Sequence, residues 1–359
     1  MKDICCIGHI TKDKIITPLS TTYMSGGTSF YFAHALSCLP DKVSFELVTK
    51  LSDEDIKAVD DLRSKGVEVV SYKSLHTVFF ENKYGKVSDN RTQRVLERAE
   101  PFTVDEVAPL EAKVFHLGSL LDDDFPVDVV ECLSHKGLVS IDAQGYLRRL
   151  EGESVLPTDW KDKLRILGMT DILKVNEHEI VSLTGYSDPH EAARQLAEWG
   201  VKEVCVTLGS HGSIIYADGV FYDIPAYEPS EVVDATGCGD TYSAGYLWCR
   251  AQGLGYYESG CFAAAMCTLK LEHSGPFFGT EEQVHRIIDN YLVKKKIPAA
   301  GHVQPPVFFY LTTLLPFTIY MPEGSPVIAS FVDTWLLNRL IVFPSMLITF
   351  VFATLLFLS

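Results

Sequence analysis

The segment Asp234–Asp240 has the residue types and spacing of an anion-binding turn that also carries a base. It reads D-A-T-G-C-G-D, and a helix-like stretch follows it directly. Gly237 and Gly239 allow a tight turn whose backbone amides converge at a helix N-terminus, which is a favourable place for an anion. A carboxylate at Asp240 is useful there if it accepts the proton of a hydroxyl that attacks a phosphoryl group. The pattern alone also fits an Asp that caps a helix.

Three more polar clusters follow apolar, strand-like runs. They read D-A-Q-G-Y-L-R at Asp142–Arg148, N-E-H-E at Asn176–Glu179 and T-L-G-S-H-G at Thr207–Gly212. At Asn176–Glu179 the residues alone fit a plain helix start, because Asn caps a helix well and Glu favours the first turn. Arg148 fits phosphate neutralisation or an ordinary surface position equally well.

The elements that must position these clusters alternate between strands and helices. This alternation predicts a mostly parallel sheet covered on both faces, with ligands at the carboxyl ends of its strands. A β hairpin outside that sheet, formed by Thr77–Phe80 and Thr92–Leu96, is predicted to act as a lid. The expected strands of the main sheet are Ile4–Ile10, Phe45–Thr49, Val67–Tyr72, Val114–Leu117, Gly137–Ile141, Ile172–Val175 and Glu203–Leu208.

Composition narrows the class of function. The chain has 359 residues and a formal net charge of −16, so it repels phosphate backbones and nucleic acid is not an expected partner. Its nine cysteines include no C-x-x-C pair, which predicts a reducing compartment and no structural zinc. The N-terminus begins with a strand-like run and shows no signal peptide, which predicts a cytoplasmic protein.

The motif at Asp234–Asp240 resembles the D-T-x-G-A-G-D motif of the PfkB, or ribokinase-like, carbohydrate kinases. The second and fifth positions differ, but both keep small side chains. The resemblance implies a three-layer α/β/α sandwich with a small β lid. It also implies ATP-dependent transfer of a phosphoryl group to a hydroxyl of a sugar, polyol or nucleoside. Asp240 would be the base, and the amides of Gly237, Cys238 and Gly239 would form the anion hole.

Further matches run in the family's order over about residues 1–296. For the acceptor, the resemblance implies Asp13, the Gly26-Gly27 hinge, Gln144 and Arg148. For Mg²⁺, bound through water, it implies Asn176 and Glu179. For the nucleotide it implies the five positions Asn176, Thr207, Gly209, Gly212 and Gly275. A monovalent cation site would be completed near His273–Pro276.

Departures from the family pattern leave the acceptor open. The family often has an Asn shortly after the diglycine, where this chain reads Thr28-Ser29-Phe30-Tyr31. The pattern around Asp142–Arg148 favours a polyol or inositol over ribose. The sequence does not decide whether ATP or ADP is the donor. It also does not decide whether the protein is a monomer or a homodimer paired through the lid. An oxidoreductase lacks support, because no G-x-G-x-x-G follows the first strand.

The composition changes after about residue 300. We expect a kinase domain over residues 1–300, with its lid from about 9–30 and 72–104, and a hydrophobic tail over residues 301–359. Leu340–Leu358 carries no charge and is about long enough to cross a bilayer. The tail fits a membrane anchor, a packed extension or non-native sequence. A non-catalytic structural or regulatory subunit, anchored at a membrane, is therefore the alternative function.

Overall fold

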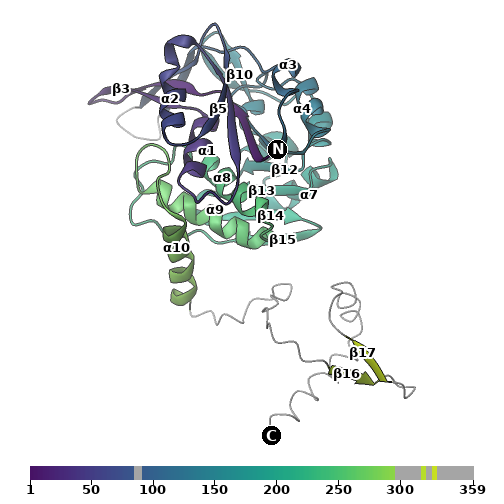
Figure 1. Cartoon of the computed structure of the whole chain (residues 1–359). Helices are drawn as coiled ribbons and strands as arrows, with labels where there is room; N and C mark the ends of the chain where they lie inside the picture. The colour runs from purple at the N-terminus through teal and green to yellow at the C-terminus, as the bar shows by residue number, and fades with distance from the viewer. Residues whose placement is uncertain (85–90, 296–316, 321–325, 330–359) are drawn as a thin grey trace. The chain divides into compact units, whose positions relative to one another are not determined.

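The computed structural model describes residues 1–84, 91–295, 317–320 and 326–329 (Figure 1). The chain divides into two compact units, Met1–Ala299 and Ala300–Ser359. In the second unit, β16 (Phe317–Tyr320) and β17 (Pro326–Ala329) pair antiparallel. The predicted span at Leu340–Leu358 lies outside the described residues. Within the described part of the chain, no helix is long and apolar enough to cross a membrane.

The first unit is built on a large sheet whose described strands run in the order β15-β14-β13-β12-β9-β8-β1-β4-β5. The strands from β13 to β5 are parallel, whereas β14 and β15 are antiparallel. Their bounds are β1 (Lys2–Gly8), β4 (Phe45–Leu51), β5 (Glu68–Lys73), β8 (Ala112–Gly118), β9 (Leu138–Asp142), β12 (Ile172–Asn176), β13 (Glu203–Thr207), β14 (Ser213–Ala217) and β15 (Val220–Ile224).

Helices cover both faces of this sheet, as the alternating pattern predicts. On β1, Ile4 and Cys6 face one helical layer, while Cys5 and Ile7 face the other, because successive side chains point to opposite faces. One layer holds α1 (Thr28–Ser37), α2 (Lys57–Ser64), α8 (Cys238–Ala251), α9 (Tyr256–Leu271) and α10 (Glu281–Lys294). The other holds α3 (Val104–Val107), α4 (Val127–Ser134), α5 (Lys163–Leu167), α6 (Glu179–Thr184) and α7 (Pro189–Glu198).

A second sheet lies outside this sandwich. Its described strands run in the order β10-β11-β7-β6-β2-β3. They are β2 (Thr11–Ile16), β3 (Thr21–Gly26), β6 (Val78–Tyr84), β7 (Arg91–Glu97), β10 (Arg148–Glu151) and β11 (Ser154–Pro157). The predicted hairpin is present as β6 and β7, while the turn between them lies outside the described residues.

The lid sheet is larger than the sequence analysis predicted, because β10 and β11 add a third hairpin beyond the segments 9–30 and 72–104. Val78, Phe80 and Val95 on its inner face pack against Leu120 and Leu121, which follow β8. This apolar contact holds the lid over the carboxyl edge of the main sheet, where ligands are expected.

Candidate active site

The start of α8 forms the turn that the D-A-T-G-C-G-D motif predicts. Gly237 has a φ of 79°, which favours glycine, and α8 begins at Cys238, so Asp240 lies in its first turn. A Cβ atom on Gly237 would lie 2.3 Å from Cδ1 of Tyr31, so no larger residue fits. The first amides of a helix have no acceptor inside it and remain available to an anion. The Cys238 amide, however, donates to the Ala235 carbonyl at 3.2 Å.

A buried ion pair lies beneath this turn. Lys174 on β12 donates from Nζ to Oδ2 of Asp142, at the end of β9, over 3.0 Å. The two side chains are 10% and 2% exposed. A Cβ atom on Gly239 would lie only 2.7 Å from Lys174 Nζ, so the ammonium packs directly against the turn. A fixed cation behind the amides strengthens the turn as a site for phosphate.

Lys174 was not among the residues that the sequence analysis selected. Its signal is a charged residue inside the otherwise apolar run Ile172–Val175 of β12. A lysine is rarely buried without a partner, so a central-strand lysine implies a nearby carboxylate. Only the packing of β9 beside β12, with Asp142 paired to Lys174, shows which carboxylate that is.

Asp240 has the environment of a general base. Burial, together with the charge of Asp142, raises the pKa of its carboxyl group to about 7, although Lys174 and Arg148 act in the opposite direction. Solvent still reaches part of the side chain. A carboxyl group that titrates near neutral pH can take a proton from an alcohol and release it again.

The predicted residues of Asp142–Arg148 come close to this cluster. Arg148 begins β10, and its charge lowers the pKa of both Asp240 and Glu179. The Gln144 amide donates to Oδ1 of Asp142 over 3.1 Å. The segment therefore runs from Asp142, which pairs with Lys174, to the third lid hairpin. Arg148 lies close enough for its charge to act on Asp240 and Glu179, so it is not an isolated surface residue.

Asn176 and Glu179 bond to each other. The Asn176 side chain donates to Glu179 Oε1 over 2.8 Å, and the Glu179 amide donates to Asn176 Oδ1 over 2.9 Å. These bonds build a helix start, which was the alternative interpretation of the motif. Burial raises the pKa of Glu179, and the Lys174 charge lowers it. In the described ranges, no group of three or more His, Cys, Asp or Glu side chains could hold a metal.

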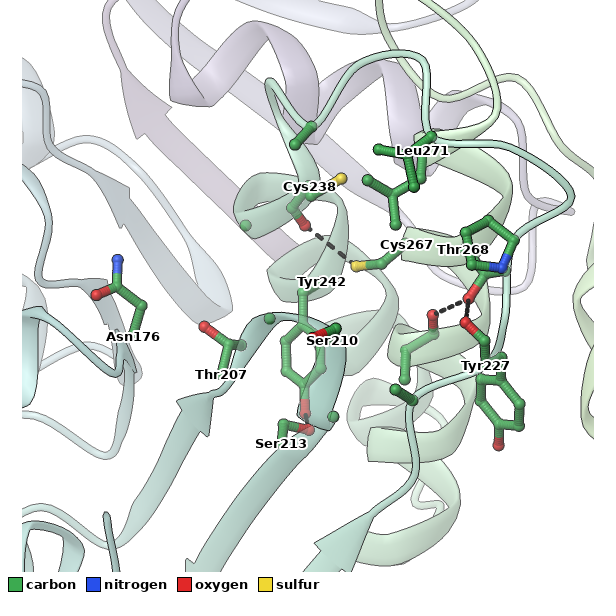
Figure 2. Close-up of a pocket in the computed structure, with 18 of the residues that line it drawn as sticks. Asn176, Thr207, Ser210, Ser213, Tyr227, Cys238, Tyr242, Cys267, Thr268 and Leu271 are labelled. Atoms are coloured by element: carbon green, nitrogen blue, oxygen red, sulfur yellow. Dashed lines mark hydrogen bonds between the residues drawn. The ribbon is translucent and has the colours of Figure 1, made fainter. Parts of the chain in front are cut away.

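A cavity of about 640 Å³ opens beside the turn at Gly237–Asp240 (Figure 2). Four predicted nucleotide positions line it, namely Asn176, Thr207, Gly209 and Gly212. Gly275 lies elsewhere, where its amide donates to Oδ2 of Asp234 over 3.3 Å. Side chains from α8 and α9 form the opposite wall, and Cys267 donates from Sγ to the Cys238 carbonyl over 3.2 Å. Other lining residues include Tyr227, Val232, Tyr242, Ala264, Thr268 and Leu271.

On the lid side, Asp13 and the two glycines lie together as predicted. Asp13 is 9% exposed and accepts a hydrogen bond from Thr11 Oγ1 over 2.7 Å. A Cβ atom on Gly26 would lie 2.4 Å from Oδ2 of Asp13, and Gly27 has a φ of 94°. A side chain at Gly26 would displace the Asp13 carboxylate, and the positive φ of Gly27 favours glycine at that position.

The inner face of the lid carries two further amides that the sequence analysis missed. Asn82 and Gln93 are register partners on β6 and β7, and Gln93 Nε2 donates to Asn82 Oδ1 over 2.9 Å. Asn82 is 6% exposed. Asp13 pairs with Phe80 in the parallel register of β2 and β6, so strand alternation puts Asn82 on the same face as Asp13.

Comparison with known proteins decides what kind of molecule this site belongs to. Residues 33–283 match the pfkB family carbohydrate kinases. The chain belongs to this family. It is a sugar or nucleoside kinase with the ribokinase fold, as the motif around Asp240 predicts.

Two relatives and one further structure show how close the likeness is. The cytidine kinase of Thermococcus kodakarensis is 30% identical over 261 residues, which cover 69% of this chain and 88% of that one. A pyrophosphate-dependent kinase of the ribokinase family, solved with a pyrophosphate analogue and myo-inositol, is 31% identical with a TM-score of 0.70. That match covers 79% of this chain and 99% of the other. Arabidopsis thaliana ribokinase with ribose and ATP, at 20% identity and a TM-score of 0.65 over 80% and 98% of the chains, shows the fold alone.

Proposed function

We propose that this pfkB-family kinase transfers the γ-phosphoryl group of ATP to a hydroxyl of a cyclitol such as myo-inositol, with Asp240 as the base. The observation that carries the proposal is the position of Asp240. It lies in the first turn of α8, beside an apolar cavity on one side and the Lys174–Asp142 pair on the other.

The cavity supports a nucleotide donor. Pyrophosphate is small and fully polar, and it needs no apolar chamber beyond the anion-binding turn. The cavity beside Gly239 is instead walled by α8, α9 and the loop around Tyr227, with largely apolar side chains. Its size and lining suit an adenine base and a ribose.

The chemical step needs few protein groups. The bond between the γ-phosphorus and the β–γ bridging oxygen breaks, the acceptor oxygen bonds to that phosphorus, and the acceptor proton passes to Asp240. Lys174 and the amides at the start of α8 offset the charge on the phosphoryl oxygens. Mg²⁺, when bound, shields the phosphate charges, and Glu179 with Asn176 would hold it through water.

Contacts join the acceptor side to the anion-binding turn. The Tyr31 amide donates to the Gly27 carbonyl over 3.1 Å, and the Tyr31 ring packs on Gly237. One side chain therefore separates the diglycine hinge from the turn. A hydroxyl held by Asp13 beside Gly26 and Gly27 would be near Asp240, as phosphoryl transfer requires.

The acceptor proposal rests on the chemistry of the lid. Asp13, Asn82 and Gln93 offer a carboxylate and two amides on one face, and Gln144 and Arg148 add polar groups from the sheet edge. Such a set matches the many hydroxyls of a cyclitol. Cytidine is the second candidate, and the 30% identity to a cytidine kinase over most of that protein's length favours it.

A donor and acceptor panel tests the proposal. Purified full-length protein is assayed for formation of the phosphorylated acceptor with myo-inositol, other cyclitols, linear polyols, ribose and cytidine, each with Mg²⁺·ATP and with Mg²⁺·pyrophosphate. We expect turnover with ATP and a cyclitol. Turnover restricted to cytidine would contradict the acceptor assignment, and turnover restricted to pyrophosphate would contradict the donor assignment. Asp240→Asn is the control for chemistry at this site.

A further inference from the structure

Lys270, near the end of α9, is a buried cation behind the anion-binding turn. It is 1% exposed. Its Nζ donates to the Asp234 carbonyl over 2.9 Å and to the His273 carbonyl over 3.2 Å. The same nitrogen lies 3.6 Å from Oδ2 of Asp234. The ammonium therefore has two carbonyl acceptors and one carboxylate as an ion-pair partner.

These oxygens have the chemistry of a monovalent cation site. Protein carbonyl oxygens replace the hydration shell of K⁺, and a carboxylate adds negative charge. They also lie where the sequence analysis expects such a site, since His273 begins the segment His273–Pro276 and Asp234 begins the glycine motif. In this chain an ammonium group already fills the place among them. A second cation there would meet a like charge at contact distance, so the residues do not fit a bound K⁺ or Na⁺.

We propose that Lys270 is a built-in substitute for the monovalent cation and makes this kinase independent of K⁺ and Na⁺. It acts as a positioning residue, through Asp234 and the start of α8. The proposal rests on the proposed function only in taking that start as the donor phosphate site.

Asp234 shows how the ammonium would act on the site. Its carboxylate accepts the Thr236 amide over 2.9 Å and the Gly275 amide over 3.3 Å. Lys270 therefore binds both ends of an assembly that joins the glycine turn to the loop after α9. Thr236 directly precedes Gly237, so loss of this assembly would loosen the turn whose amides face the donor.

Lys50 provides a matched control. It is also buried, at 3% exposed, and its Nζ donates to the Pro101 carbonyl over 2.8 Å and lies 2.7 Å from Glu106. Both Lys270→Ala and Lys50→Ala remove a buried ammonium from a carbonyl and a carboxylate, so both should destabilise the fold. Only the Lys270 variant should acquire a response to monovalent cations.

The experiment compares wild type, Lys270→Ala and Lys50→Ala in KCl, NaCl, ammonium chloride and choline chloride at equal ionic strength. Thermal unfolding and calorimetric binding of Mg²⁺·AMP-PCP are measured in each salt. Wild-type Tm and affinity should be the same in all four salts. In choline chloride, Lys270→Ala should bind the analogue about tenfold more weakly. KCl or ammonium chloride should restore its affinity and raise its Tm.

Two results would overturn the proposal. One is a wild-type protein whose Tm or analogue affinity rises specifically with KCl or NaCl. The other is a Lys270→Ala variant whose salt response matches that of Lys50→Ala. If wild type binds no AMP-PCP, the donor assignment fails on its own, and the Tm comparison still decides whether Lys270 replaces a cation.

Discussion

The half of the site that we propose for the donor and the half that we propose for the acceptor are built in different ways. On the donor side, the turn at Gly237–Asp240 and the loop at Thr207–Gly212 are short continuous segments at the edge of the main sheet. On the acceptor side, Asp13, Asn82 and Gln93 come from three strands of the lid, joined by parallel and antiparallel pairing. Local backbone geometry makes the first half, whereas strand register makes the second.

This contrast explains why the phosphate-binding half is easier to predict from the sequence than the acceptor half. A phosphate is held largely by backbone amides and one or two cations, so glycine spacing reports it. An acceptor is distinguished by side-chain hydrogen bonds, and these depend on which strands pair. The predictions below test whether donor-side changes remove chemistry while acceptor-side changes alter only acceptor use.

The largest effect is expected at Asp240. Asp240→Asn keeps the shape of the side chain but cannot accept the acceptor proton, so kcat should fall by about a thousandfold. Binding of Mg²⁺·AMP-PCP, measured by calorimetry, should persist. Glu46→Gln is the control, because it also removes a buried carboxylate whose pKa is raised. Retained kcat in Asp240→Asn would remove Asp240 from the mechanism.

A smaller loss is expected at Lys174. Lys174→Met keeps the length of the side chain but removes the cation beneath Gly239, and kcat should fall by about a hundredfold. The control is Lys50→Met, which deletes a buried lysine that donates to Pro101 instead. Equal losses of kcat in the two variants would mean that Lys174 serves stability alone.

Acceptor-side variants should behave differently. Asn82→Leu with Gln93→Met replaces both amides by apolar groups of similar size, so kcat/KM for the acceptor should fall by about tenfold. KM for ATP should stay unchanged in the same steady-state assays. Glu81→Gln, which alters the Lys14–Glu81 pair on neighbouring strands, is the control. A tenfold rise in the KM for ATP as well would contradict the division of the site into a donor half and an acceptor half.

The smallest effect concerns stability and pH. The pKa of Asp240 is about 7 in the folded protein, above the ordinary value of 3.8 for an aspartate, so the folded state holds the proton more tightly than the unfolded state. Wild type therefore loses stability as pH rises from about 4 through about 7, and Asp240→Asn avoids this loss. Above pH 7 we expect the variant to be more stable by about 1–3 kcal/mol, allowing for the partial exposure of Asp240. Denaturant titrations at several pH values would measure it, and an equal difference at pH 4 would contradict it.

Several parts of the fold followed from local pattern. The run Ile4–Ile7 is apolar at every position, and such a run is typical of a strand buried on both faces. In the structure all four side chains are buried. The β6–β7 hairpin followed from period-two alternation. The third hairpin, β10–β11, was missed because Arg148–Pro157 is short and largely polar, and it joins the lid sheet only where β11 pairs with β7. Tertiary pairing, not propensity, decides such edge strands.

The family, the class of reaction and the turn that carries Asp240 could be predicted from residue order alone, because glycine spacing and strand–helix alternation are local patterns of a few residues. Only the tertiary structure placed Lys174 against Gly239, Asn82 beside Gln93, and Lys270 on the carbonyls of Asp234 and His273. A buried charge or amide depends on partners from distant segments. A charged residue in an apolar run of the sequence shows that burial would cost free energy. Only the contacts of the folded protein show which groups offset that cost.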